Sequence, residues 1–258
     1  MSHILANGVK TYIQRLGAGD KKIVFVHGLV LDNLSSFYFT LANPLAQYAD
    51  VLLYDLRGHG KSDRPATNYD LATLLADLHA VINDQFPNEK VYVAGNSFGG
   101  LMALTYAIEH PEKTAGLILV DPLLPLAGWR EDMVTTLTLE KNIVDRLYHE
   151  LYKNWHAKES ERKKQKLKDT VDKILGDTSI LADIAHSKEY APQDISNIAC
   201  PAIAVYGAES NILDSGHKLK ALAPHVDLQI VPESTHLILF ENTEKLKDLV
   251  IQWLTQQR

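Results

Sequence analysis

One serine lies in a sequence pattern that is typical of a hydrolytic nucleophile. The segment Gly95-Asn96-Ser97-Phe98-Gly99 directly follows the apolar run Val91 to Ala94, and apolar residues at helical spacing come after it. In such a strand–turn–helix the turn is too sharp for side chains beside the serine, so glycines flank it at two-residue distance. The pattern predicts that the Ser97 hydroxyl stands clear of the backbone and attacks a carbonyl carbon, forming an acyl-enzyme.

The same turn predicts where the negative charge of that reaction would be stabilised. Ser97 would precede the first turn of the following helix, and a helix N-terminus favours negative charge. The backbone N–H of Phe98 would then face the oxygen that becomes an oxyanion.

Two further segments make the sequence resemble the α/β-hydrolase family. His27-Gly28-Leu29 follows an apolar run, and a second run leads into Asp55-Leu56-Arg57-Gly58-His59-Gly60-Lys61-Ser62. Family members carry a His-Gly turn at the first place and an Asp-x-Arg-Gly-x-Gly-x-Ser loop at the second. We interpret this loop as architectural. The resemblance also implies that His27 and His59 are structural residues that transfer no protons.

The resemblance assigns further parts of the site. It implies that the N–H of Leu29 is a second oxyanion donor, paired with that of Phe98. It also implies that His236 is the catalytic base, because the family places its histidine a few residues after the last strand, commonly with a glutamate five residues on. Here that glutamate is Glu241. The order of serine first and histidine near the C-terminus also fits.

The acid that should complete a triad is missing from its usual place. The family usually supplies an aspartate three or four residues beyond the glycine that ends the strand Ile203 to Tyr206. Those two positions hold Ser210 and Asn211. An acid is needed to hold the imidazole tautomer and to stabilise the imidazolium, so its absence puts efficient catalysis in question.

Three alternatives can fill the gap. Asp121 ends the apolar run Leu117 to Val120, and some members, notably certain haloalkane dehalogenases, place their acid after this strand. Glu209 or Asp214 could instead reach from the usual loop. In the third alternative Asn211 orients His236 as a neutral partner, at a loss of up to about 10⁴ in kcat. We favour Asp121 as the working hypothesis.

These residues require a sheet to position them. Short apolar runs without polar alternation predict parallel strands covered on both faces; they are 23–26, 51–54, 91–94, 117–120, 203–206 and 228–231. Amphipathic helical patterns lie between or after them, at 71–82 and 246–254. Asn7-Gly8 predicts a tight hairpin near the N-terminus. The predicted fold class is α/β, an α/β-hydrolase fold with a mostly parallel central sheet flanked by helices.

The strand–helix alternation breaks between about Pro122 and Asn197. We interpret 122–197 as a helical cap inserted into a core of residues 1–121 and 198–258. Apolar cap residues predict a pocket lining, with Leu124, Trp129 and Tyr148 as substrate-binding residues. Other candidates for the same surface are Leu123, Leu147 and Trp155.

Composition limits the partners. The 258 residues carry a formal charge of −6, with 46% hydrophobic and 22% charged residues, so a nucleic-acid partner is not expected. The basic run 163–166 is offset by nearby acidic residues, and we interpret it as a solvated helix face. No leader and no apolar stretch of membrane-spanning length is evident, which predicts a cytoplasmic protein. The histidines do not cluster at ligand spacing, so we predict no metal and no organic cofactor.

The predicted function is hydrolysis of an ester or thioester with a small to medium acyl group. Hydrolysis of a carbon–carbon bond in a diketone is the nearest enzymatic alternative, since similar capped members perform it with the same triad. A serine in place of an aspartate nucleophile argues against dehalogenase or epoxide hydrolase chemistry. With the usual acid absent, a slow-turnover small-molecule receptor is the alternative from another class.

Overall fold

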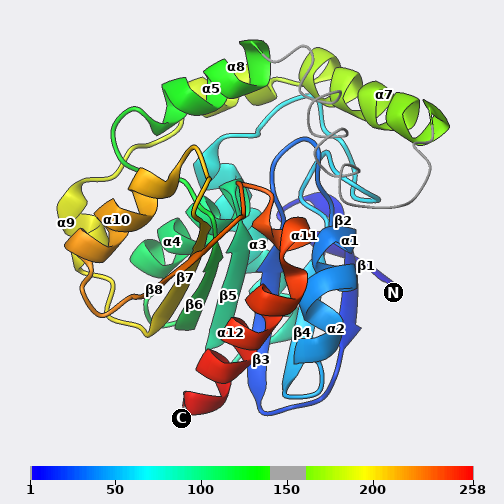
Figure 1. Ribbon diagram of the computed structural model, residues 1–258. Coiled ribbons are helices and arrows are strands. Elements are labelled where there is room, and N and C mark those ends of the chain that lie inside the picture. The colour runs from blue at the N-terminus through cyan, green and yellow to red at the C-terminus, as the bar shows by residue number, and fades with distance from the viewer. Residues whose placement is uncertain (1, 140–160, 258) are drawn as a thin grey trace.

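The centre of the molecule is a twisted sheet of eight strands. The computed structural model describes residues 2–139 and 161–257. Within these ranges the strand order is β1-β2-β4-β3-β5-β6-β7-β8 (Figure 1). β1 and β2 pair antiparallel, as do β2 and β4, and the remaining neighbours are parallel. The strands are β1 Ser2–Ala6, β2 Val9–Leu16, β3 Lys21–Val26, β4 Ala49–Tyr54, β5 Val91–Asn96, β6 Thr114–Val120, β7 Ala202–Gly207 and β8 Asp227–Val231. The predicted fold class is confirmed.

The predicted hairpin also forms. β1 and β2 are joined by Asn7 and Gly8, which adopt φ angles of 46° and 78°. Positive φ at both central residues is what a tight two-residue hairpin turn requires, and asparagine and glycine reach it at the lowest cost.

Alternating strand residues bury two separate cores. On β3, Val24 and Val26 belong to one apolar cluster, whereas Ile23 and Phe25 belong to the other. The first cluster includes residues of α3 Leu71–Gln85, α4 Phe98–Glu109 and α10 Leu213–Leu222. The second includes residues of α1 Ser35–Phe37, the π-helix η1 Tyr38–Ala42, α2 Asn43–Leu45, α11 Ile238–Glu241 and α12 Thr243–Gln256. Both faces of the sheet are therefore covered, which explains why its central strands lack polar alternation.

Three of the described helices lie above the carboxyl edge of the sheet (Figure 1). They are α5 Trp129–Leu139, α7 Glu161–Asp177 and α8 Ile180–Ala185. The two ends of this segment are joined where Leu126 and Tyr190 form an isolated parallel bridge and Gly128 N–H donates to Glu189 at 2.8 Å. A fourth helix, α9 Pro192–Ser196, contacts α4 and α10 of the core. The boundaries 122–197 stay a prediction.

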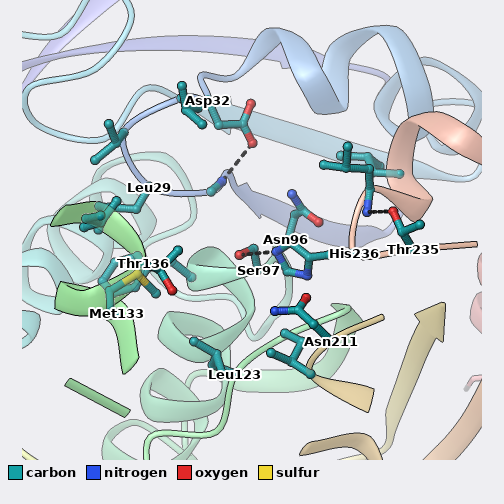
Figure 2. Close-up of a pocket in the computed structure, with 18 of the residues that line it drawn as sticks. Leu29, Asp32, Asn96, Ser97, Leu123, Met133, Thr136, Asn211, Thr235 and His236 are labelled. Carbon is teal, nitrogen blue, oxygen red and sulfur yellow. Dashed lines mark hydrogen bonds between the residues drawn. The ribbon is translucent and has the colours of Figure 1, made fainter. Parts of the chain in front are cut away.

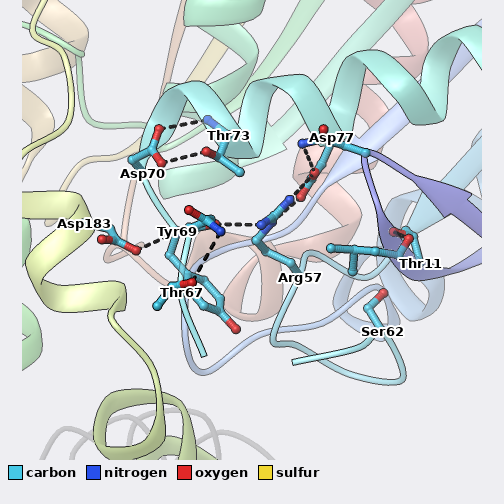
Figure 3. A network of polar contacts seen from close by, with 12 residues as sticks. Thr11, Arg57, Ser62, Thr67, Tyr69, Asp70, Thr73, Asp77 and Asp183 are labelled. Carbon is cyan, nitrogen blue, oxygen red and sulfur yellow. Dashed lines mark hydrogen bonds and ion pairs between the residues drawn. The ribbon is translucent and has the colours of Figure 1, made fainter. Parts of the chain in front are cut away.

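A polar network anchors this upper layer to the core (Figure 3). The buried Arg57 guanidinium pairs with Asp77 of α3 and donates to the Asn68 carbonyl at 2.8 Å. Nearby, Tyr69 N–H donates to Asp183 of α8 at 2.7 Å. The loop after β4 is thus tied to α3, and the next segment of the chain is tied to α8, in agreement with the architectural role predicted for this loop.

In the described part of the chain, no helix is long and apolar enough to cross a membrane. The same residues contain no group of three or more His, Cys, Asp or Glu side chains arranged to hold a metal ion.

Candidate active site

Ser97 lies at the tip of a strained turn between β5 and α4. Its backbone has φ 53° and ψ −117°, and its N–H donates to the Val120 carbonyl at 2.9 Å. A Cβ placed on Gly95 would lie 2.1 Å from the Gly99 carbonyl oxygen, and one on Gly99 would lie 2.0 Å from that of Val26. Both glycines are therefore required by close backbone approach, and the strain at Ser97 is stored at the point where the hydroxyl is presented.

His236 joins the serine to a buried carboxylate. Its Nε2 lies 2.9 Å from Ser97 Oγ (Figure 2), and its Nδ1 lies 2.6 Å from Asp121 Oδ2. With the Nδ1 proton donated to the carboxylate, Nε2 is left as the acceptor for the serine hydroxyl. The structure thus brings Ser97, His236 and Asp121 into one hydrogen-bonded row.

The Asp121 carboxylate accepts hydrogen bonds from three different residues. It is fully buried, at 0% exposure, directly after β6 and with φ 46°. Its Oδ1 accepts from Gly207 N–H at 2.9 Å, and its Oδ2 accepts from Ser210 Oγ at 2.6 Å as well as from His236. A buried carboxylate is costly unless such donors replace its water, so this site is built to hold a charge.

The other acid candidates lie away from the imidazole. Glu209 and Asp214 are exposed, and neither contacts His236 through a hydrogen bond among the residues described. Asn211 lines the cavity near His236 (Figure 2) but likewise makes no such bond there. Ser210, at the position where the family usually has its acid, instead donates to Asp121. That substitution was the signal in the sequence that could have linked Ser210 to the relocated carboxylate.

The turn that carries His236 is braced by Glu241. The Glu241 carboxylate accepts from the Thr235 N–H at 2.7 Å and from its hydroxyl at 3.0 Å. Glu241 therefore fixes the residue next to the base, which gives a physical reason for a glutamate five residues after the histidine.

Two residues of the cavity that Ser97 lines have backbone N–H groups without an acceptor among the described residues. Phe98 is the first residue of α4, so its N–H has no carbonyl partner within the helix. Leu29 lies between two fixed amides, because Gly28 N–H donates to Asp32 at 2.9 Å and Val30 N–H donates to His59 at 2.7 Å. Among the described residues, Leu29 N–H meets no acceptor. Leu29 and Phe98 line the same cavity as Ser97.

Two buried histidines shape the loop that holds Leu29. His27 Nε2 accepts from Leu56 N–H at 3.0 Å, and its Nδ1 donates to the Gly28 carbonyl at 2.7 Å. His59 donates from Nδ1 to the Arg57 carbonyl at 2.8 Å while Nε2 accepts from Val30. Burial, with a smaller contribution from His27, lowers the pKa of His59 to about 3. His59 is therefore neutral at physiological pH, as its acceptor role requires, and both histidines serve the structure.

A cavity of about 660 Å³ opens above Ser97 and His236 (Figure 2). Its walls are mostly apolar, and several of the residues come from the layer above the sheet: Leu123, Met133, Leu137, Leu167, Val171 and Leu175. Its charged lining residues other than His236 are Asp32 and Glu209. No Lys or Arg is among the described residues that line it. The size and character fit a small, largely apolar ligand.

Two predicted substrate-binding residues lie elsewhere. Leu124 and Trp129 are 5% and 2% exposed and pack in the core rather than lining the cavity. The Trp129 indole N–H donates to the Lys188 carbonyl at 3.2 Å, and its ring lies 6.2 Å from that of Phe98. These residues fix the layer to the core. Tyr148, Leu147 and Trp155 lie outside the described residues.

Several of the lining residues that sequence reasoning missed lie on helices α5 and α7. Leu167, Val171 and Leu175 of α7 recur at four-residue spacing, so they share one helix face. That apolar stripe within a charged helix was the available signal.

Comparisons with known proteins show the family of the chain. The family model for the alpha/beta hydrolase fold matches residues 21–175, and the chain belongs to this family. Hydrolase activity is supported by this membership and by the relatives below.

Relatives cover most of the chain. It is 26% identical to the AB hydrolase superfamily protein YisY of Bacillus subtilis, over 95% of both chains. It is 25% identical to a 2-hydroxy-6-oxononadienedioate/2-hydroxy-6-oxononatrienedioate hydrolase of Comamonas testosteroni, over 79% of this chain and 76% of the relative. Among solved structures, an esterase from Exiguobacterium antarcticum superposes with a TM-score of 0.78 at 21% identity, over 99% of both chains.

Proposed function

We propose that this protein hydrolyses uncharged carboxylic esters and thioesters with small to medium apolar acyl groups. The observation that carries the proposal is the hydrogen-bonded row Ser97–His236–Asp121 at the floor of an apolar cavity. Residues 122–197 act in this proposal as a cap that excludes water from the cavity, with α5 and α7 supplying its roof.

The proposed reaction has two steps. Ser97 Oγ attacks the carbonyl carbon while His236 Nε2 takes its proton, and the buried Asp121 carboxylate stabilises the imidazolium. The N–H groups of Leu29 and Phe98 bind the oxyanion, a donor type whose loss typically costs about 10²–10³ in kcat. His236 then protonates the leaving alcohol or thiol, and the acyl group stays on Ser97. Water deprotonated by His236 releases the acid and restores the serine.

Asp121 is the acid in this proposal, and Ser210 is its positioning residue. Gly207 N–H and Ser210 Oγ bind the two carboxylate oxygens from β7 and the loop after it. The loop that usually supplies the family's acid therefore supplies hydrogen-bond donors to an acid from the neighbouring strand. Ser210 touches no reacting atom and acts through Asp121.

Carbon–carbon bond hydrolysis is the second candidate, because the Comamonas relative is named as a hydrolase of an oxo-substituted dioate. The same row of residues could serve it. A dioate carries two negative charges, however, and the described cavity lining offers Asp32 and Glu209 without an opposing Lys or Arg. This charge balance favours uncharged esters.

The test uses p-nitrophenyl esters of increasing acyl length together with a fluorophosphonate probe. We expect turnover that peaks at short to medium acyl length and labelling of Ser97, both abolished in Ser97→Ala. Labelling without turnover of any ester would contradict the esterase and favour either the carbon–carbon hydrolase or a slow-turnover receptor. Absence of labelling would contradict an activated serine altogether.

A further inference from the structure

A second cavity, of about 670 Å³, lies beside the first. Val30, Leu31 and Asp32 line both cavities, so this short segment forms a shared wall. The remaining walls of the second cavity come from β2, from the residues up to Phe39, from the loop after β4 and from α7. Apart from the shared wall, Leu167 of α7 is the one residue that lines both cavities among those described.

The second cavity carries cationic side chains. Lys61, Arg64 and Lys166 line it, and none of them forms an ion pair with another described residue. Lys61 Nζ lies 4.6 Å from the centre of the Tyr12 ring, so the ammonium group lies over an aromatic wall. In a chain of net charge −6, this local group of cations makes the site attractive to anions.

The acidic residues beside these cations accept hydrogen bonds from backbone N–H groups. The two oxygens of Asp55 accept from the backbone N–H groups of Leu34 and Lys61, each at 2.8 Å. The oxygens of Asp32 accept from Gly28 and Asn33 N–H. These amides fix both carboxylates in place, and among the described residues no ion pair joins Asp32 or Asp55 to the cationic side chains of this cavity.

A mostly buried glutamine lies in the wall of the cavity. Gln14 is 7% exposed and lies on β2, two residues from Tyr12 and hence on the same face. Its side chain lines the cavity and makes no hydrogen bond to any residue in ranges 2–139 and 161–257. Since Gln14 is not among the residues whose buried polar atoms lack a partner, its amide N and O atoms are accessible from the cavity, where they can bond a ligand.

We propose that the second cavity binds a small organic carboxylate. Lys61 and Arg64 hold the carboxylate group, Tyr12 and Tyr38 contact an aromatic or aliphatic body, and Gln14 supplies a hydrogen bond. The site goes beyond the proposed ester hydrolysis and does not depend on it. Because His59 lines this cavity and holds Val30, an occupant contacts the loop that fixes the Leu29 amide.

Two sources of such a ligand share this chemistry, namely the acid released by hydrolysis and an unrelated aromatic carboxylate. Calorimetric titration of the full chain with butyrate and with benzoate separates them. Tighter binding of butyrate indicates the released acid, and tighter binding of benzoate indicates an aromatic effector. Benzamide, a neutral analogue of benzoate, is expected to bind at least about tenfold more weakly, since it lacks the charge that Lys61 and Arg64 attract.

Variants of the lining residues test whether the carboxylate binds in the second cavity. We expect the double variant Lys61→Gln/Arg64→Gln to lose about tenfold or more in carboxylate affinity, and Gln14→Leu to lose several-fold. The matched control Lys218→Gln/Lys245→Gln removes the same charge from exposed positions that line neither cavity and should bind like the parent. Circular dichroism and melting temperature check that each variant is folded.

A final experiment tests whether the carboxylate binds in the cavity above Ser97 instead. Protein whose Ser97 carries a fluorophosphonate adduct should keep its carboxylate affinity. The proposal is overturned if the adduct abolishes binding, if the double variant binds like its control, if benzamide binds like benzoate, or if neither carboxylate binds. Should Ser97 resist labelling, the proposed function fails while the variants still decide this site.

Discussion

Two cavities of nearly equal volume share the wall Val30–Asp32 but differ in how they handle charge. Above Ser97 the proposed oxyanion donors are backbone N–H groups, and the described lining holds no Lys or Arg. Across the wall, Lys61, Arg64 and Lys166 supply formal charge. Amides fixed by neighbouring hydrogen bonds can thus prepare a site for a charge that develops during reaction, whereas side-chain cations that form no ion pair with the described residues suit a ligand that is charged from the start.

The largest expected effect is a loss of catalysis above Ser97 with no change in ligand binding at the second cavity. Asp121→Asn should lower kcat by about 10⁴, because the imidazole loses its charged partner. Glu209→Gln and Asp214→Asn should stay within about twofold of the parent, since neither residue contacts His236 in the described structure. Steady-state kinetics measures this, and benzoate affinity should not change. If Asp121→Asn retains full kcat, the assignment of the acid is wrong.

A smaller effect on kcat is expected at Ser210, which positions Asp121. Ser210→Ala should lower kcat by roughly tenfold with KM unchanged, because it removes one charge-assisted hydrogen bond from Asp121 without touching the substrate. Ser210→Thr, which keeps the hydroxyl, should restore most of the rate. A change in KM alone, or no rescue by threonine, would contradict a positioning role.

A substitution in the shared wall should change both cavities in opposite directions. Asp32→Asn leaves a single side-chain acceptor for Gly28 and Asn33, so we expect kcat to fall by about fivefold as the Leu29 amide loses its support. Removing the negative charge should also raise benzoate affinity by about twofold. Parallel kinetics and calorimetry test this, and equal directions of change would contradict two separate sites.

The smallest effect at neutral pH concerns His59. Its pKa of about 3 lies below the ordinary value of 6.5, so the unfolded chain binds the proton more readily than the folded chain. The stabilisation from the neutral ring is complete above about pH 6.5 and is lost progressively as pH falls toward 3. Denaturant titrations should show a shallower decline in the free energy of unfolding for His59→Gln, and an unchanged slope would contradict this account.

Local patterns in the sequence predicted most of the fold. The apolar runs, the Asn7-Gly8 turn and the glycines around Ser97 each encode a backbone requirement that neighbouring residues satisfy. From the sequence alone, Asp121 was one of several candidates for the triad acid. Only the packing of β6 against β7 brings it beside Gly207 and Ser210, and local patterns do not encode that packing.

The upper layer was harder to predict for a physical reason. Leu124 and Trp129 are as apolar as the true lining residues, and periodicity does not say which apolar face meets the core and which meets a cavity. The second cavity draws on β2, the loop after β4 and α7, so no single segment carries its signature. Lys166 belongs to a run interpreted as a solvated face, and it is exposed while also lining this cavity.

The preference of the cavity above Ser97 for uncharged acyl groups can be tested directly with two esters of equal length. p-Nitrophenyl pentanoate is uncharged, and p-nitrophenyl hydrogen glutarate carries a carboxylate in place of the terminal methyl group. If the cavity above Ser97 selects uncharged acyl groups, kcat/KM should be at least about tenfold higher for the pentanoate, because Asp32 and Glu209 repel the glutarate. Equal values, or a preference for the glutarate, would contradict the account.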